Sequence, residues 1–128
     1  MSNWIPFVEG EYFVEMACLA APDHTAVALE NVIVEVYSDQ RGNRQLKGSG
    51  RVRNILIVEL LEDNDDLDLL LDLGQEFKYL LRKPELQAGK VFTPDVKSTL
   101  RFTPTGPWEQ IPLDKFETLL SRLRFLDA

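Results

Sequence analysis

Cysteine and histidine are almost missing from this chain of 128 residues, which contains one of each, Cys18 and His24. A single cysteine excludes an intrachain disulfide and any zinc site built from several cysteines. Because Asp23 and His24 follow Ala21-Pro22, a turn-forming sequence, we expect His24 in a surface turn rather than in a catalytic group. We expect Cys18 to be a small core residue. The sequence thus predicts no catalytic residues, no metal ligands and no cofactor.

Long hydrophobic runs are also missing. The longest candidate, Ile55–Val58, ends at Glu59 and is far shorter than the roughly 18 residues that cross a bilayer. The first residues carry no positive charge, and Glu9 and Glu11 fall where a secretory leader would be apolar. Together with the lone cysteine, these features predict a cytoplasmic protein without a membrane partner.

Positive charge is in deficit, with 14 Lys and Arg against 21 Asp and Glu and a net charge of -7. This balance argues against a nucleic-acid partner, because phosphate binding needs an excess of basic residues. The charges are also segregated: residues 41–53 hold five basic and no acidic residues, and residues 54–77 hold eight acidic and no basic ones. Two interpretations fit: neighbouring strands whose opposite charges pair, or two separate binding faces.

What the chain does have is apolar content, 45% of its residues, in a length suited to one domain with its own core. We expect residues 1–128 to form a single domain, with a β core and an N-terminal arm over 1–105 and a helix over 112–126. The predicted fold is mainly β, a sandwich or open barrel of about seven strands with one C-terminal amphipathic helix.

Alternation of apolar and polar residues carries the β prediction. The stretch with glycines at positions 48 and 50 is read as an exposed or edge strand. The individual predictions are a strand over Glu11–Cys18, a strand over Val32–Tyr37, the edge strand over Gln45–Arg53 and a buried strand over Ile55–Leu61.

Residues 67–82 fit either a helix or a hairpin. A helix would place Gly74 in its interior, at a cost of about 1 kcal/mol relative to alanine. A hairpin turning at Gly74–Glu76 matches apolar and oppositely charged residues in one register. We therefore favour the hairpin, whose predicted cross-strand pairs are Leu69 with Leu81, Leu70 with Leu80, Leu71 with Tyr79, Asp72 with Lys78 and Asp68 with Arg82.

The C-terminal helix has the strongest helical signal. Pro112 suits its first turn, acidic residues follow, and Arg122 and Arg124 come late, as the helix dipole favours. Its apolar residues fall on one face, namely Leu113, Phe116, Leu119, Leu120, Leu123 and Leu126. Such a face closes the protein's own core or docks against a partner.

We expect a non-catalytic protein–protein interaction module, an accessory subunit of a larger assembly. Its predicted contacts are the apolar N-terminal arm, the acidic loop 62–68 and the C-terminal helix. The partner-binding residues assigned to the arm and the helix are Trp4, Ile5, Phe7, Leu119, Leu123 and Leu126.

Two alternatives remain at this point. The first is a Ca²⁺-dependent β-sandwich binding domain with Asp63, Asp65 and Asp72 as ligands, because Ca²⁺ prefers carboxylate oxygens. The second is a small Mg²⁺-dependent nuclease in which Asp72 and Glu76 hold the metal and Lys78 contacts the phosphate; the hairpin register places all three on one face. A solvated acidic loop and a cross-strand ion pair explain the same residues without metal chemistry.

Overall fold

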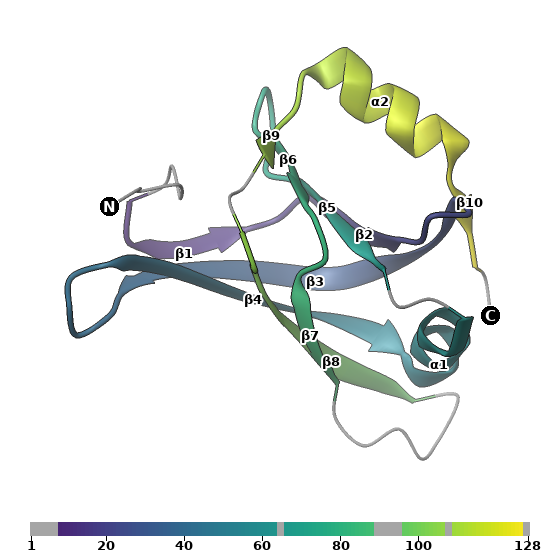
Figure 1. Ribbon diagram of the computed structural model, residues 1–128, viewed down its shortest axis with the longest axis horizontal. Coiled ribbons are helices and arrows are strands. Elements are labelled where there is room, and N and C mark those ends of the chain that lie inside the picture. Colours follow the sequence, from purple (N-terminus) through teal and green to yellow (C-terminus); the bar gives the residue numbers. More distant parts are fainter. Residues whose placement is uncertain (1–7, 64–65, 89–95, 107–108, 127–128) are drawn as a thin grey trace.

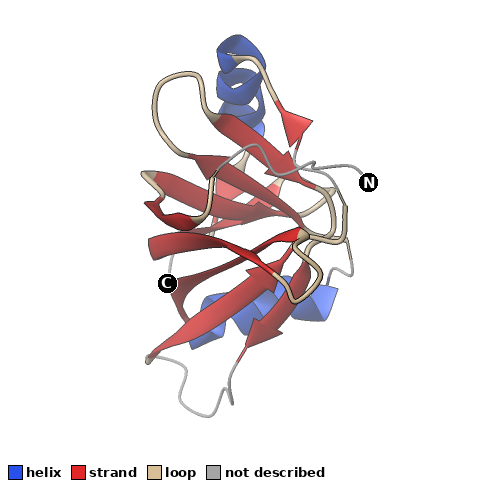
Figure 2. Ribbon diagram, turned by 90° about the vertical axis from the view of Figure 1, so that its left-hand side faces the viewer, coloured by secondary structure: helices blue, strands red, loops and turns tan. Residues whose placement is uncertain are grey.

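A computed structural model shows one open, curled β-sheet that resembles half of a barrel, with a helix on each side (Figures 1 and 2). It describes residues 8–63, 66–88, 96–106 and 109–126, and in these residues ten strands and two helices are found. The strands pair antiparallel, except for the last one. A mainly β fold with a C-terminal helix is thereby confirmed, whereas the sandwich and the count of about seven strands are not.

Strand β3 (Thr25–Ser38) runs through the whole sheet. Its first half pairs with β2 (Met16–Ala20), and its second half lies between β1 (Gly10–Phe13) and β4 (Arg44–Arg53). The bend between the halves coincides with Asn31, which has a φ of 51°, and with a shift of register. The single strand predicted over Glu11–Cys18 is therefore two strands, because the segment follows this bend.

Half-sheet A is our name for the part formed by β1, the second half of β3, β4, β8 (Lys97–Thr103) and β7 (Glu85–Ala88), in that order. The prediction that Gln45–Arg53 is an edge strand is wrong, since β4 lies between β3 and β8. Its glycines face the core: a Cβ on Gly48 would lie less than 3.0 Å from ring atoms of Phe102. The ring of Phe102, on the neighbouring strand β8, fills the space over Gly48.

Half-sheet B is the part formed by the first half of β3 with β2, β5 (Asp68–Asp72), β6 (Lys78–Leu81) and β9 (Glu109–Gln110). The predicted hairpin is confirmed in its register, from Leu69 opposite Leu81 to Asp72 opposite Lys78. Gly74 and Gln75 have positive φ values in the turn. Only the outermost predicted pair differs, because Arg82 forms its ion pair with Glu109.

Helix α1 (Asn54–Asp63) stands where a buried strand was predicted over Ile55–Leu61. Leu56 and Leu60, one helical turn apart, pack against the main core. Consecutive apolar residues suit a buried strand as well as a helix, so the pattern does not separate the two. Among the described residues, no helix is long and apolar enough to cross a membrane.

The segregated charges do not lie on neighbouring strands. The basic residues 41–53 form the turn into β4 and β4 itself, which is flanked by β3 and β8, and Lys47 pairs with Glu35 of β3 at 3.5 Å. The acidic residues 54–77 belong to α1, the segment after it and the β5–β6 hairpin. The interpretation of the two stretches as neighbouring strands is therefore wrong.

Two apolar cores hold the fold together. The main core fills the inner side of the curled sheet and includes residues of both half-sheets. The smaller one lies between the outer side of half-sheet B and helix α2 (Leu113–Arg122) and comprises Cys18, Leu70, Leu80, Ile111 and Phe116. Burial of Cys18 confirms its predicted core position.

Helix α2 is shorter than the predicted 112–126, because the chain leaves it at Leu123 and forms a last strand, β10 (Arg124–Phe125). Strand β10 pairs in parallel with the start of β3: the Arg124 amide donates to the His24 carbonyl at 2.7 Å, and the Leu126 amide to the Ala26 carbonyl at 2.8 Å. Two short strands, β9 and β10, thus follow residue 105, where the β core was expected to end.

Candidate functional site

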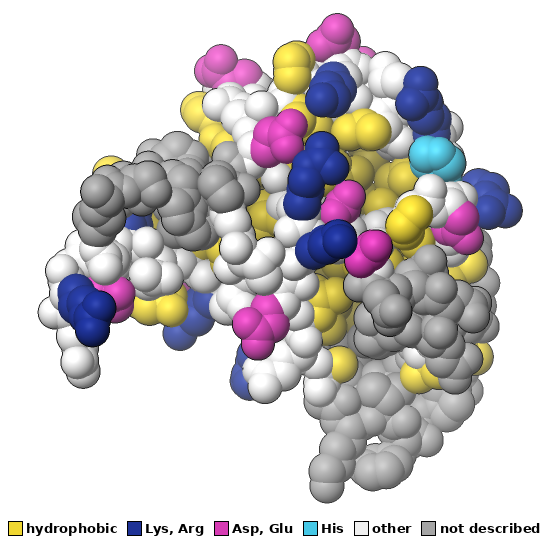
Figure 3. Space-filling view, in the orientation of Figure 1, with side chains coloured by type: hydrophobic (Ala, Val, Ile, Leu, Met, Phe, Trp, Pro, Cys, Tyr) yellow, Lys and Arg dark blue, Asp and Glu magenta, His cyan; other side chains and the backbone are white. Residues whose placement is uncertain are grey.

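A groove of about 340 Å³ lies between α2 and the outer side of half-sheet B. Figure 3 shows hydrophobic side chains in it, between Lys, Arg, Asp and Glu side chains, with the histidine at its border. We call this feature the α2 groove. The apolar side chains that line it are Ala20, Ala21, Pro22, Leu70, Leu80, Leu119 and Leu123.

The groove follows from the strand and helix periods. In the hairpin, Leu69 and Leu71 face the main core, so alternation turns Leu70 outward, and its cross-strand partner Leu80 with it. Leu119 of α2 and Leu123, which directly follows the helix, form the opposite wall and are half-buried. One helix cannot cover the whole width of a five-stranded face, so part of the face stays open.

Three of the predicted partner-binding residues can now be placed. Leu119 and Leu123 lie together in the groove wall, as their spacing indicated. Leu126 lies apart from them and packs against the main core, because the chain has left the helix before it. The assigned arm residues Trp4, Ile5 and Phe7 lie outside the described residues.

Helix α2 is fixed at both ends of the groove. At its start, the Ile111 amide donates to the Lys78 carbonyl at 3.0 Å, and the buried Phe116 ring lies 6.0 Å from the Lys78 ammonium. At its end, β10 pairs with β3. The helix therefore bridges the groove between two anchors, and the groove width is set by the fold.

The rim carries charges of both signs. Lys83 pairs with Asp66 at 3.2 Å and Arg82 with Glu109 at 3.4 Å, both pairs being exposed. Lys115 of α2 also lines the groove, and among the described residues it has no ion-pair partner. An unpaired cation beside apolar side chains suits a ligand that combines apolar and acidic groups.

His24 borders the groove in a turn that the backbone fixes. Its φ is 72°, its amide donates to the Ala21 carbonyl at 3.0 Å, and its carbonyl accepts from β10. The Thr25 amide donates to the Asp23 carboxylate at 3.0 Å, and this hydrogen bond lowers the pKa of Asp23. The structure thus places His24 in the predicted turn, as part of the groove border.

Cys18 lies in the smaller core, between half-sheet B and α2, and its thiol has no access to solvent. Burial raises its pKa to about 12, since desolvation penalises the thiolate. A thiol with this pKa is protonated at neutral pH and is a poor nucleophile. Cys18 therefore packs as an apolar residue in the smaller core.

The residues considered for a nuclease are partly brought together. Lys78 Nζ lies 2.6 Å from Asp72 Oδ1, and this oxygen also accepts from the Gly74 amide at 2.8 Å. Lys78 is buried against Phe116, so a phosphate could reach its ammonium only after α2 moved away. Glu76 stays in the exposed turn. Asp72 and Lys78 therefore form a cross-strand ion pair, which is the explanation without metal chemistry given in the sequence analysis.

For the calcium site, Asp72 is the one predicted ligand whose side chain is described, and it is bound to Lys78. Asp65 and the side chain of Asp63 lie outside the described residues. Of the nearby carboxylates, Asp66 pairs with Lys83 and Asp68 accepts the Lys83 amide at 3.2 Å. In the described part of the chain, no three Asp, Glu, His or Cys residues are grouped as metal ligands.

Sequence reasoning missed most of the groove lining. The sheet residues Leu70 and Leu80 could have been found, because the predicted register already placed them together on the face opposite Leu69 and Leu71. Nothing in the sequence indicated that this face meets α2, which is more than thirty residues further along. Comparison with protein-family models, curated proteins and solved structures gives no significant match.

Proposed function

We propose that the chain is a non-catalytic protein–protein interaction module, an accessory subunit of a cytoplasmic assembly, and that the α2 groove is its docking site. The observation that carries the proposal is the groove itself: apolar walls from α2 and half-sheet B, open to solvent and held at fixed width. A monomeric domain without a ligand gains nothing from leaving such a surface open, whereas a partner segment would bury it.

The chemistry of the lining defines the occupant. A volume of about 340 Å³ is at the lower end of ligand pockets, which corresponds to a few apolar side chains rather than a whole helix. Lys115 lies at the border without an ion-pair partner in the described part of the chain. The occupant we propose is a short segment of a partner protein that inserts apolar side chains and places an acidic residue beside Lys115.

A blocking substitution tests the proposal. Ala20 lies at the end of β2 and lines the groove, so Ala20→Leu fills part of it without removing any contact of α2. Ser121→Leu adds an apolar side chain to the exposed side of α2 and is the matched control. Peptides selected from a displayed random library on the wild-type protein are then titrated against all three proteins.

We expect the selected peptides to combine apolar and acidic residues, to lose at least about tenfold in affinity for Ala20→Leu and to bind Ser121→Leu unchanged. Lys115→Glu should weaken the same peptides by a smaller factor, since one rim charge contributes little. A library that yields no binder, or binders that Ala20→Leu does not weaken, would contradict docking in this groove.

A further inference from the structure

Strand β1 is a free edge of half-sheet A. It pairs with β3 on one side, and in the described part of the chain no segment pairs with it on the other. In Figure 1 it lies at the left, away from α2, so this edge is separate from the α2 groove. The strand ends at Phe13, whose side chain is 80% exposed and is the most exposed of the large apolar residues that the structure describes.

The hydrogen-bond pattern determines which backbone groups of β1 point away from β3. The Val14 amide donates to the Val32 carbonyl at 3.0 Å, and in an antiparallel ladder the residues that exchange hydrogen bonds alternate with residues that do not. Tyr12 therefore bonds to β3, whereas the amide and carbonyl groups of Glu11 and Phe13 point to the open side. Within the described residues, none of these amide and carbonyl groups of Glu11 and Phe13 has a hydrogen-bond partner.

Edge strands are commonly protected against pairing with another chain by lysine, proline or a bulge. The other edge strand of half-sheet A, β7, begins directly after Pro84 and has no exposed large apolar side chain. Strand β1 contains no lysine and no proline, and its register with β3 is regular. Of the two edges, β1 is therefore the one that is open to a further strand.

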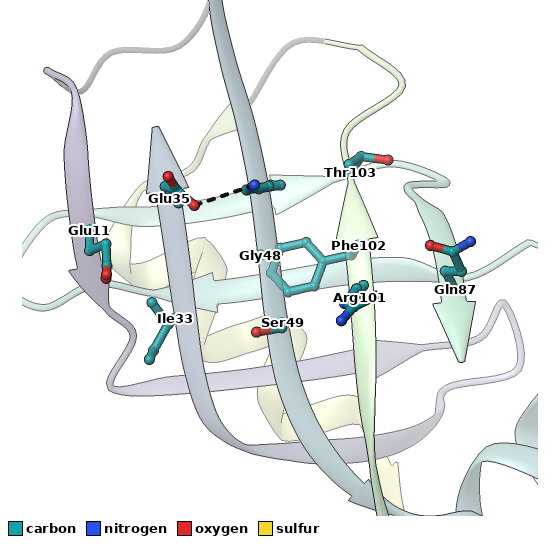
Figure 4. Close-up of a pocket in the computed structure, with 10 residues that line it drawn as sticks. Glu11, Ile33, Glu35, Gly48, Ser49, Gln87, Arg101, Phe102 and Thr103 are labelled. Atoms are coloured by element: carbon teal, nitrogen blue, oxygen red, sulfur yellow. Dashed lines mark ion pairs between the residues drawn. The ribbon is translucent and has the colours of Figure 1, made fainter. Parts of the chain in front are cut away.

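The charge around β1 is of one sign. Residues 8–16 contain three glutamates and no basic residue. Glu35, which lies opposite Glu11 on β3, is paired with Lys47 at 3.5 Å (Figure 4). Glu11 itself has no ion-pair partner among the residues that the structure describes. A strand added to β1 therefore meets an acidic edge, which attracts basic residues.

We propose that β1 receives an extended, basic segment of a partner protein, which adds a strand to half-sheet A. The backbone of this segment bonds to the amide and carbonyl groups of Glu11 and Phe13 that point away from β3. Side chains alternate between the two faces of a sheet, so the partner residues opposite Glu11 and Phe13 lie on one face, two positions apart. A basic residue suits the position opposite Glu11, and an apolar residue suits the position opposite Phe13.

The charge favours such a partner over a second copy of this chain. Pairing of β1 with the β1 of another copy places glutamates of both copies on adjacent strands, where like charges repel. Each chain also carries a net charge of -7, so two copies repel each other before they make contact. A basic segment is attracted both at a distance and at the edge itself.

The probe for this edge is the peptide Lys-Thr-Val-Thr-Lys-Thr-Val, blocked at both ends, which carries lysine and valine on one face. Amide exchange with water, measured by NMR, gives a readout at single residues. We expect saturable binding with a Kd of about 100 μM. At ten times this concentration, exchange at the amides of Glu11 and Phe13 should slow about tenfold, with no change in residues 113–122. The same peptide with every backbone nitrogen methylated cannot donate hydrogen bonds and should bind at least about tenfold more weakly.

Variants of the edge complete the test. Phe13→Pro removes one edge amide but no hydrogen bond to β3, because this amide points away from β3. It should weaken binding at least about tenfold, and Phe13→Thr, which keeps the amide, should weaken it less. Glu11→Lys should weaken binding about fivefold, whereas Glu117→Lys, the same change on the exposed side of α2, should leave it unchanged. Ala20→Leu, which fills the α2 groove, should also have no effect.

Several results would overturn the proposal. They are the absence of saturable binding up to about 1 mM, equal binding of the methylated peptide, and unchanged exchange at Glu11 and Phe13 in the complex. Binding that Ala20→Leu removes would assign the peptide to the α2 groove instead. Slow exchange at the two edge amides without peptide would show that the edge is already covered, by a second copy or by another part of the chain.

Discussion

Two ion pairs of this protein have the same N–O distance but differ in burial, and we predict that their contributions to stability differ accordingly. Lys78 lies 2.6 Å from Asp72, with the side chains 8% and 19% exposed. Lys97 lies 2.6 Å from Glu30, with the side chains 46% and 51% exposed. The perturbation is the same in both cases: each lysine is replaced by methionine, which keeps the length and removes the charge.

Lys78→Met leaves the Asp72 carboxylate with the Gly74 amide as its remaining partner and removes the cation beside the Phe116 ring. Breaking a buried ion pair costs about 3–5 kcal/mol, and the lower end applies because Asp72 is partly exposed. Loss of the ring contact adds about 0.5 kcal/mol. We expect the free energy of unfolding to fall by about 3 kcal/mol and the Tm by about 10 °C.

Lys97→Met should cost at most about 1 kcal/mol, since water and side-chain entropy offset an exposed pair. Urea unfolding followed by fluorescence measures both variants, and Lys78→Met combined with Asp72→Leu should be less destabilised than Lys78→Met alone. If Lys78→Met costs no more than Lys97→Met, the ion pair does not hold the hairpin beneath α2, and the reasoning from burial is wrong.

Three further predictions concern the two cores. Gly48→Ala should lower the free energy of unfolding by about 2 kcal/mol, because its Cβ meets the Phe102 ring, while Gly106→Ala, which has open space, should be neutral in the same urea titration. Phe116→Ala should cost about 3 kcal/mol and loosen α2, which faster amide hydrogen exchange in 113–122 would reveal; unchanged exchange would contradict the anchoring role. Burial raises the pKa of the Cys18 thiol to about 12, above its value of 9.0 when unfolded, and burial, with Glu76 nearby, also raises that of Tyr79 above 10.0. The unfolded chain therefore loses these protons first, so these two groups should make stability fall between pH 9 and pH 12, and Cys18→Ala should reduce the fall between pH 9 and pH 10.

The hairpin could be predicted in all but its outermost pair because several constraints agreed. Apolar residues matched on both faces, Asp72 and Lys78 carried opposite charges, and Gly74 supplied the turn, so one register satisfied them all. The helix over 113–122 was predictable for a similar reason, since its apolar residues and its terminal charges indicate the same element. These predictions were correct because the apolar pattern, the charges and, in the hairpin, the turn glycine all indicated the same element, and not because any one pattern was strong.

The failures share a different cause. Gly48 suggested an edge strand, but its missing side chain is replaced by Phe102, more than fifty residues away. Ile55–Leu61 has too many consecutive apolar residues to distinguish a strand from a helix. The α2 groove joins β2, the hairpin and α2 through tertiary packing, so no local pattern could reveal it.

The parallel pairing of β10 with β3 has a consequence for biosynthesis. Residues 124 and 125 must reach residues 25 and 26, which leave the ribosome about a hundred positions earlier. Before β10 pairs with β3, α2 lacks its second anchor and does not stably cover the outer apolar side of half-sheet B. A nascent chain therefore passes through a stage in which this surface is open to chaperones, and the native fold is completed only after translation of these last strand residues.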